Sequence, residues 1–287
     1  MKSYDTPIII ISAGRSGTKM LRSILTSHPE LCCFPHEINY IWRYGNAQLS
    51  SDELNFTHVR PDVIRYIHKR FRILSEKNNG RRVVEKTCAN SLRVEFVHTI
   101  FPKAFFIHLI RDGRAVAESA RRCWRSRPTT RYIIEKARWL PLRDIPLYGI
   151  RYLRYQFART RSRERAQASW GPRFNGLDKL VKEKTLIEVC GIQWKACLQA
   201  AESGIRRLPP ESTVTLRYED IVKDAQRAVK KIFHMLNLDL EPEYLQFVQN
   251  EVHSMNLNKW QESLSPEDLQ LLIPHIEPEL LSQGYEI

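Results

Sequence analysis

Short runs of consecutive apolar residues recur along the chain, and each is followed by a turn. Residues 7–11 and 105–110 are rich in Ile, Leu and Phe, and residues 213–216 form a third run that alternates with Thr. Runs this short favour strands over helices, and a strand without polar alternation is typical of a parallel sheet covered on both faces. We therefore predict a central, mainly parallel sheet built from these buried strands.

Helical patterns fill the intervals between the strands. Residues 39–80 are predicted to be helical and polar, and apolar residues recur at helical spacing over residues 58–74 and 221–236. Strands that alternate with helices indicate an α/β fold with helices on both faces of the sheet. The chain of 287 residues has no internal repeat and is long enough for one such domain, residues 1–287.

The first strand leads directly into a loop with the composition of an anion site. Residues 12–19 are small and basic, and an amphipathic stretch with Leu21, Ile24 and Leu25 follows them. A helix that starts after such a loop offers unpaired N–H groups, and its dipole favours negative charge there. The order strand, loop, helix therefore predicts a site for a phosphate or a similar group.

This loop differs from the P-loop of kinases. No glycine stands five positions before Gly17, and Met20 follows Lys19 where the kinase motif has the Ser or Thr that binds magnesium. Arg15 instead supplies a fixed cation within the loop. We expect the loop to hold its anion without a metal ion.

A second motif follows the strand at 105–110. Arg111 stands at the carboxyl end of that strand, where open α/β sheets bind ligands, and Ser119 lies two turns into the next helix. Two strand ends that each bind phosphate within one sheet indicate a nucleotide with anionic groups at both ends.

Together the motifs resemble those of sulfotransferases that use 3′-phosphoadenosine 5′-phosphosulfate (PAPS). The loop at 12–19 resembles the family's 5′-phosphosulfate loop, and residues 105–119 resemble its 3′-phosphate strand, loop and helix. Further segments resemble those of the bacterial, glycosaminoglycan and tyrosylprotein branches and follow in the same order. They are Val83-Val84-Glu85-Lys86-Thr87, Leu216-Arg217-Tyr218-Glu219-Asp220, Asn256-Leu257-Asn258-Lys259-Trp260, Leu264-Ser265 and Gly284-Tyr285.

The resemblance implies a P-loop-like three-layer fold with a central, mainly parallel sheet flanked by helices, and PAPS as the co-substrate. It assigns the 5′-phosphosulfate to Arg15, Ser16, Gly17, Thr18 and Lys19, the 3′-phosphate to Arg111 and Ser119, and further donor contacts to Tyr218 and Lys259. Two positions depart from the family pattern. Lys19 stands where Thr or a small polar residue is more common, and the family's supporting arginine aligns nearer to Cys123 than to Arg122.

Sulfuryl transfer requires stabilisation of charge and removal of a proton. A sulfuryl group carries less negative charge than a phosphoryl group, so fixed cations can replace magnesium. Charge develops on the bridging oxygen of the leaving 5′-phosphate, and preorganised donors there supply much of the stabilisation. Arg15, Lys86 and the N–H groups of the loop are the candidates for this role.

Three residues are candidates for the base that takes the proton of the acceptor hydroxyl. Glu37 stands where the glycosaminoglycan branch carries its catalytic Glu, and His36 stands where the tyrosylprotein branch carries its own base. Glu85 is the third candidate, although it could instead be a buried partner that orients Lys86. The sequence leaves all three open.

Net charge points to an anionic partner. The chain carries a formal charge of +13, and most of the excess lies between residues 121 and 165, among interleaved Trp and Tyr residues. We interpret residues 121–175 as an Arg-rich, aromatic insertion that binds the acceptor as a lid or faces an anionic membrane. The alternative is a solvated lid whose arginines hold the donor or pair locally. No nucleic-acid motif accompanies the charge, so we expect no nucleic-acid partner.

The cysteines and the hydropathy of the chain indicate the cellular compartment in which the protein is expected. The six cysteines show no metal-ligand spacing, which favours reduced thiols. No apolar run approaches the roughly 18 residues of a membrane span, and the Ile run at the start is better used as a strand. We expect a cytoplasmic protein with a peripheral membrane contact as a further option.

These expectations combine into one functional hypothesis. The chain is predicted to move the sulfuryl group of PAPS to a hydroxyl of a carbohydrate or glycolipid, by in-line attack with a carboxylate base. One alternative is a tyrosylprotein-type acceptor. The other is a nucleotide- or membrane-binding P-loop-like protein without transferase activity.

Overall fold

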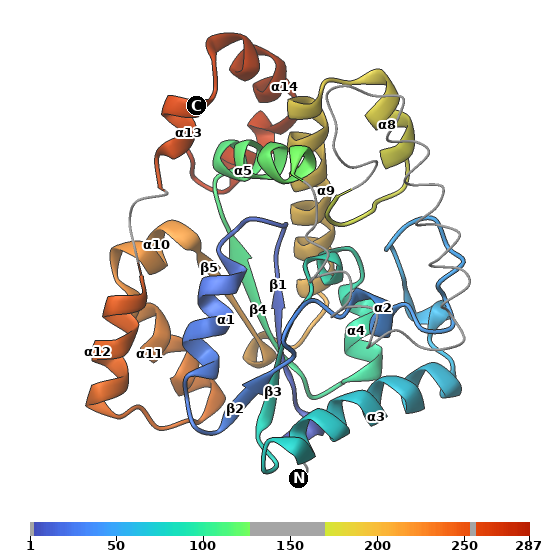
Figure 1. Ribbon diagram of the computed structural model, residues 1–287, viewed down its shortest axis with the longest axis vertical. Coiled ribbons are helices and arrows are strands. Elements are labelled where there is room, and N and C mark those ends of the chain that lie inside the picture. The colour runs from blue at the N-terminus through green and yellow to red at the C-terminus, as the bar shows by residue number, and fades with distance from the viewer. Residues whose placement is uncertain (1–2, 127–169, 253–256) are drawn as a thin grey trace.

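A computed structural model describes residues 3–126, 170–252 and 257–287 of the chain (Figure 1). Most of the Arg-rich segment 121–175 therefore lies outside the described residues, and so does Asn256 of the late motif. The expected role of that segment stays a prediction.

Five parallel strands form the central sheet, in the order β2-β3-β1-β4-β5. Their bounds are β1 Ile8–Ile11, β2 Leu31–Cys33, β3 Arg82–Lys86, β4 Phe105–Ile110 and β5 Thr213–Arg217. Ile8 of β1 pairs with Val84 on one side and with Phe105 on the other. Since all strands run in one direction, their carboxyl ends meet at a single edge, and the predicted α/β fold is confirmed.

Both faces of the sheet are covered because successive side chains of β1 point to opposite faces. Ile8 and Ile10 pack with α1 (Thr18–Thr26) and α11 (Ala225–Leu236), whereas Ile9 and Ile11 pack with residues of α3 (Pro61–Lys77) and α4 (Val94–Ile100). Figure 1 shows these two helical layers on either side of the strands.

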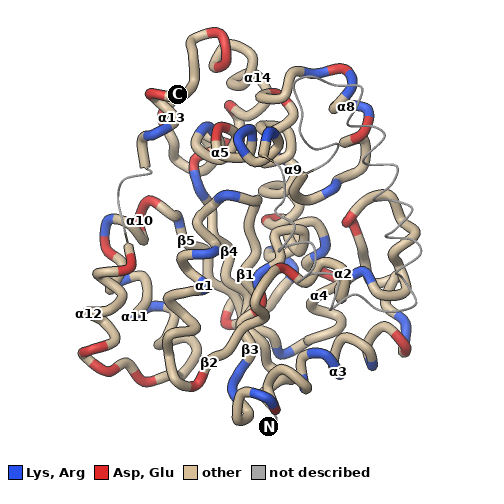
Figure 2. The backbone as a smooth tube through the Cα atoms, viewed as in Figure 1, with Lys and Arg blue, Asp and Glu red and all other residues tan. Residues whose placement is uncertain are grey.

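A third group of helices lies beyond the carboxyl edge of the sheet. Helix α5 (Gly113–Arg125) crosses this edge, and it packs against α9 (Leu186–Ile205) and α14 (Pro266–Ser282) around the buried Trp124 and Trp194 (Figure 1). Figure 2 shows Lys and Arg residues gathered along α5. The remaining described helices are α2 Asn39–Trp42, α8 Leu177–Glu183, α10 Tyr218–Lys223, α12 Pro242–Glu251 and α13 Lys259–Ser263, with 3-10 turns η1 Ser3–Asp5, η2 Phe56–His58, η3 Cys88–Leu92 and η5 Pro210–Ser212.

The helical prediction for residues 39–80 is wrong in its middle part. Residues 43–55 form a loop between α2 and η2. The buried Arg43 guanidinium donates a 2.8 Å hydrogen bond to Asp52 and further bonds to backbone carbonyls of the loop, so its donors fix a non-helical path. Helix α3 begins only at Pro61, which the first turn of a helix tolerates because it needs no N–H there.

The helix expected over residues 221–236 is divided in two. Asp224 separates α10 from α11, and its side chain accepts a 2.9 Å hydrogen bond from the N–H of Arg227. An aspartate that caps a new first turn in this way ends the previous helix. Within the described ranges, the chain has no helix with the length and apolar character needed to span a bilayer.

Candidate functional site

The loop after β1 turns sharply through two residues with left-handed backbone. Arg15 has φ 78° and Gly17 has φ 89°, and Gly17 caps α1 without a side-chain hydrogen bond. The N–H groups of the first turn of α1 therefore remain for an anion. A Cβ at Gly17 would stand 2.3 Å from the ring of Tyr218, so only glycine fits this position.

The two predicted anion motifs meet at this edge of the sheet. Arg15, from the loop after β1, donates a 2.9 Å hydrogen bond from Nε to Oγ of Ser119 on α5. Arg111, at the end of β4, donates a 3.1 Å bond from its guanidinium to the carbonyl of Arg15. The pocket at their junction is lined by Arg15, Arg111, Ala115, Glu118, Ser119, Arg122, Tyr218, Lys259 and Trp260.

Arg111 is held in a largely buried position in this pocket. Its guanidinium lies 4.3 Å from the ring centroid of Tyr218, in a cation–π contact. Burial lowers the pKa of Arg111, and the adjoining Arg15 acts in the same direction. A cation that has lost much of its water gains most from an anionic ligand, and a phosphate would supply one.

The C-terminal part of the chain reaches the same pocket through α5. The guanidinium carbon of Arg114 lies 4.2 Å from the ring centroid of Trp260, in a cation–π contact. Arg114 also forms a 2.8 Å ion pair with Asp112. Arg121 and Asp268 form a second link at 2.7 Å between α5 and the start of α14. These contacts bring Lys259 to the pocket from more than a hundred residues away in sequence.

A second charged centre lies at the end of β3. Lys86 is buried, with a side chain 5% exposed, and its Nζ donates to Oε1 of Glu37, whose side chain is 35% exposed. Cys88 Sγ lies 3.4 Å from the same oxygen. Burial by itself would lower the pKa of Lys86, but the neighbouring Cys88 and Glu37 raise it overall, so Lys86 carries its charge at neutral pH.

The other two candidate bases lie in different surroundings. Glu85 is 1% exposed, and its carboxylate accepts hydrogen bonds from Thr87 Oγ1 at 2.5 Å and Asn90 Nδ2 at 2.8 Å. Burial raises the pKa of Glu85 to about 7. His36 is partly exposed, and its Nε2 lies 3.5 Å from the hydroxyl of Tyr40.

The remaining loop residues differ in accessibility. Ser16 is buried, and its Oγ has no hydrogen-bond partner within the described ranges. Thr18 is buried with its hydroxyl 4.0 Å from the sulfur of Cys88, next to Glu37 and Lys86. Lys19 is exposed and does not line the pocket. The buried, unpartnered hydroxyl of Ser16 is the kind of group that a bound oxyanion satisfies.

Sequence reasoning missed residues that reach the loop from α9 and the segment before it. A Cβ on Gly14 would stand 3.1 Å from the ring of Trp170, so the indole packs directly on the loop. Gln193 holds this indole in place by donating to the carbonyls of Trp170 and Pro172 at 2.9 and 2.8 Å. Trp194 donates to the carbonyl of Arg111 at 3.1 Å. In the sequence, the adjacent Gln193 and Trp194 are the signal that could have pointed to these contacts.

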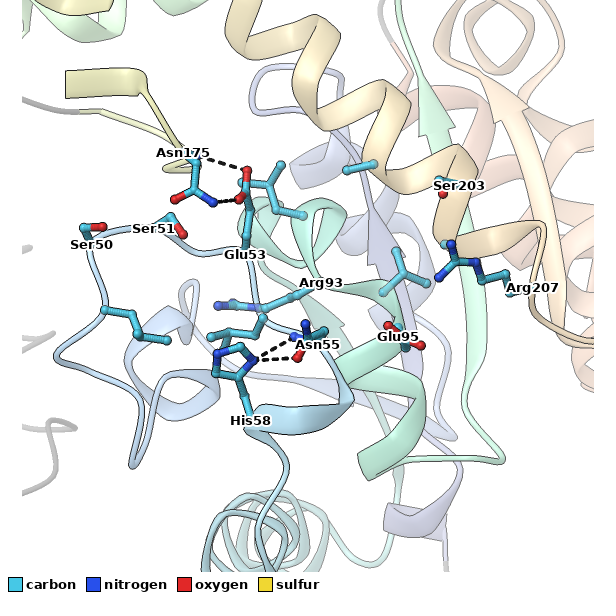
Figure 3. Close-up of a pocket in the computed structure, with 16 residues that line it drawn as sticks. Ser50, Ser51, Glu53, Asn55, His58, Arg93, Glu95, Asn175, Ser203 and Arg207 are labelled. Atoms are coloured by element: carbon cyan, nitrogen blue, oxygen red, sulfur yellow. Dashed lines mark hydrogen bonds between the residues drawn. The ribbon is translucent and has the colours of Figure 1, made fainter. Parts of the chain in front are cut away.

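A further groove lies away from both centres (Figure 3). It runs between the loop at 49–58, the start of α4 and the end of α9, and none of the predicted site residues lines it. Figure 3 labels its polar lining, which includes Glu53 hydrogen-bonded to Asn175, and His58 hydrogen-bonded to Asn55.

Sulfotransferases are among the solved structures that share this fold. The sulfotransferase domain from the curacin biosynthetic pathway is 19% identical, with 98% of each chain covered and a TM-score of 0.61. The sulfotransferase domain of the Synechococcus PCC 7002 olefin synthase is 18% identical, with 98% of this chain and 96% of that chain covered and a TM-score of 0.54. Mouse sulfotransferase SULT7A1, complexed with PAP, is 13% identical, with coverages of 96% and 85% and a TM-score of 0.52.

The sequence itself carries a family match over the part of the chain that contains both anion motifs. No curated protein matches the chain. Residues 7–140, however, match the model of the sulfotransferase family, and this segment includes β1, β3, β4 and the loops that follow them. Residues 7–140 are therefore similar in sequence to the sulfotransferase family, and the chain shares its fold with solved sulfotransferases.

Proposed function

We propose that this protein is a sulfotransferase that transfers the sulfuryl group of PAPS to the hydroxyl of an acceptor. The observation that carries the proposal is the hydrogen bond between Arg15 and Ser119. It joins the loop after β1 to the helix after β4, so one ligand with an anionic group at each end can contact both motifs. The complex of mouse SULT7A1 with PAP, in a protein of the same fold, supports a bisphosphate nucleotide as the ligand.

The donor is proposed to bind across these two motifs. The N–H groups at the start of α1, with the hydroxyls of Ser16 and Thr18, hold the 5′-phosphosulfate. Arg111 and Ser119 hold the 3′-phosphate, and Lys259 adds a cation from the C-terminal segment. Tyr218 supports the site because its ring stacks on Arg111 and packs against Gly17. Lys19 is the least supported donor contact, since it lies outside the pocket.

Glu37 is proposed as the base and Lys86 as the cation that assists the leaving group. The acceptor oxygen forms a bond to sulfur while the bond from sulfur to the bridging oxygen of the 5′-phosphate breaks. The hydroxyl proton passes to Glu37, and the electron pair leaves with PAP. Lys86, already in contact with Glu37, is a fixed charge that can stabilise the developing negative charge on the leaving oxygen together with Arg15.

The contact with Lys86 favours Glu37 over the two alternatives, and its partial exposure favours it over the buried Glu85. Glu85 is enclosed, and both of its oxygens accept hydrogen bonds from neighbours, so an acceptor hydroxyl cannot reach it without rearrangement. His36 contacts Tyr40. Glu37, in contrast, contacts the Lys86 ammonium directly.

A carbohydrate or glycolipid hydroxyl is the proposed acceptor, with the Arg-rich segment 121–175 as the surface that binds it or faces a membrane. The charge and aromatic content of that segment support an anionic glycan or lipid. The six cysteines form no disulfide bond, which supports a reducing compartment such as the cytoplasm. A screen with labelled PAPS against sugars, glycolipids and acidic Tyr peptides tests this assignment, and sulfation of the Tyr peptides alone would replace it with the tyrosylprotein alternative.

Donor recognition is tested by titrating the protein with PAP, ADP and AMP, with and without Mg²⁺. PAP is expected to bind at least about tenfold more tightly than ADP, because ADP lacks the 3′-phosphate that charged donors contact. Mg²⁺ is expected to leave the affinity for PAP unchanged. Equal affinity for PAP and ADP, or ADP binding that requires Mg²⁺, would contradict the proposal and favour a nucleotide-binding protein of another class.

A further inference from the structure

The backbone beside Glu37 is anchored to the end of β3. The N–H of Ile38 donates a 3.0 Å hydrogen bond to Thr87 Oγ1, and the Thr87 hydroxyl in turn donates to Glu85 Oε1 at 2.5 Å. Ile38, Thr87 and Glu85 are each at most 1% exposed. Water therefore cannot replace either bond, and the chain of bonds defines the position of the residue that follows Glu37.

The second oxygen of Glu85 is linked to Asn39, the first residue of α2, through Asn90 and Arg93. Asn90 donates from Nδ2 to Glu85 Oε2 at 2.8 Å and accepts a 2.8 Å bond from Nε of Arg93. Arg93 then donates to Oδ1 of Asn39 at 2.6 Å. Two chains of hydrogen bonds thus start at the buried Glu85 carboxylate, and they end at Ile38 and Asn39, the two residues that follow Glu37.

The outer end of this network is also fixed. Asn39 donates to Asp52 Oδ1 at 3.0 Å, and Arg43 donates to the same oxygen at 2.8 Å. Asp52 further accepts the N–H of Arg173 at 2.9 Å, which ties in the segment that begins with Trp170. The loop that bears Glu37 is therefore held from β3 on one side and from residues 43–52 on the other.

We infer that Thr87, backed by Glu85, is a positioning residue that sets the Glu37 carboxylate against Lys86. Lys86 and Thr87 are consecutive, so one strand end holds the side chain of Glu37 through Lys86 and its backbone neighbour through Thr87. Glu85 then acts through Thr87 and Asn90 and takes no proton from substrate. This inference rests on the proposed function, in which Glu37 is the base.

Precise placement matters because proton transfer requires hydrogen-bond distance. A displacement of about 1 Å in a reacting group can reduce the rate by about 100-fold. Loss of the Thr87 hydroxyl leaves the Ile38 N–H without its acceptor and frees the loop at that point. The donor pocket does not involve Thr87, so its affinity for PAP is expected to persist.

The test compares Thr87→Val, which removes the hydroxyl and keeps the shape, with Thr87→Ser, which keeps the hydroxyl. Thr87→Val is expected to lower kcat about 10- to 100-fold and to leave the Kd for PAP within about twofold of the unchanged protein. Thr87→Ser is expected to recover most of kcat. Equal kcat for the two variants would overturn the inference.

A double variant separates positioning from an independent effect. In the Glu37→Gln background, Thr87→Val is expected to reduce kcat no further, since Thr87 acts through the group already removed. A further reduction of the same size as in the unchanged protein would overturn the inference. If Glu37→Gln alone retains full kcat, the proposed base fails. If Glu37→Gln is slow and Thr87→Val is fast, only the positioning role fails.

Asn39→Ala gives a second test that does not depend on the fold tolerating Thr87→Val. Asn39 is only partly buried and ends the other branch. This variant is expected to lower kcat by about 3- to 30-fold, with an unchanged Kd for PAP and no further loss in the Glu37→Gln background. Full kcat in Asn39→Ala would overturn the part of the inference that runs through Asn90 and Arg93.

Discussion

Arg15 donates a 2.9 Å hydrogen bond to Ser119 across 104 residues of sequence, and this contact links the side chains of the two anion motifs. Arg15 lies in the loop after β1 and Ser119 in the helix after β4, and these two strands are neighbours in the sheet. Parallel strands bring their carboxyl ends to one edge, so residues that follow them in sequence lie side by side. The pocket is thus a consequence of sheet order.

Ser119→Ala is expected to weaken PAP binding by about 10- to 100-fold, because a hydrogen bond to a charged group is worth about 1.5–3 kcal/mol. Isothermal titration with PAP measures the change. ADP, which has no 3′-phosphate, serves as the control ligand and is expected to bind the variant as it binds the unchanged protein. A similar loss for both nucleotides would mean that Ser119 supports the pocket without contacting the 3′-phosphate.

Gly17→Ala is expected to destabilise the fold and to abolish tight PAP binding. The new Cβ would stand 2.3 Å from the Tyr218 ring at a residue with φ 89°, so the loop must shift. Gly80→Ala is the matched control, since Gly80 has φ 78° but nothing within 4 Å of an added Cβ. The control is expected to lose only the backbone cost, about 1–2 kcal/mol.

Urea unfolding and PAP titration of both variants make the comparison. A smaller or equal loss of unfolding free energy in Gly17→Ala, with PAP affinity intact, would show that the loop accommodates a side chain. The close approach of Tyr218 would then have no role in shaping the anion site.

Local patterns account for the sheet and for the two motifs that follow β1 and β4. The runs at 7–11 and 105–110 are short and predominantly apolar, so their assignment as buried strands follows from composition. The loop at 43–55 is different, because the hydrogen bonds of Arg43 to Asp52 and nearby carbonyls fix its path. A helical spacing of apolar residues carries no information about such bonds.

The surroundings of the candidate bases could not be predicted from the sequence either. Glu85 and Lys86 are adjacent and both ionisable, yet Glu85 enters a closed hydrogen-bond network while Lys86 reaches Glu37. Alternation along a strand sends neighbours to opposite faces but does not say which face is open. Trp170 reaches the loop at Gly14 only through the packing of α9, which no local motif indicates.

Glu37→Gln is expected to lower kcat by about 10²–10⁴-fold, the range for loss of a general base, while PAP affinity is retained. The amide oxygen of Gln can still accept a hydrogen bond from Lys86, so the buried ammonium keeps a partner. Initial rates with labelled PAPS and a saturating acceptor measure the effect. Glu30→Gln, at an exposed position before β2, is the control and is expected to keep full activity. Unchanged turnover in Glu37→Gln would reject Glu37 as the base.

Glu85 makes stability depend on pH in a defined direction. Burial raises the pKa of Glu85 from 4.5 to about 7 in the folded chain, partly offset by the hydrogen bond from Thr87. The folded state therefore binds the proton more tightly than the unfolded state does. By linkage, the contribution of Glu85 is most favourable below pH 4.5 and is lost as the pH rises towards 7.

Glu85→Gln, which is neutral at every pH, removes this dependence. The difference in unfolding free energy between the variant and the unchanged protein is expected to shift in favour of the variant as the pH rises from about 4.5 to about 7, and to be constant above that range. Urea unfolding at half-unit steps of pH measures it. A difference that is flat across this range, or that shifts in favour of the unchanged protein, would mean that Glu85 is ionised throughout and that its network with Thr87 and Asn90 is built around a buried negative charge.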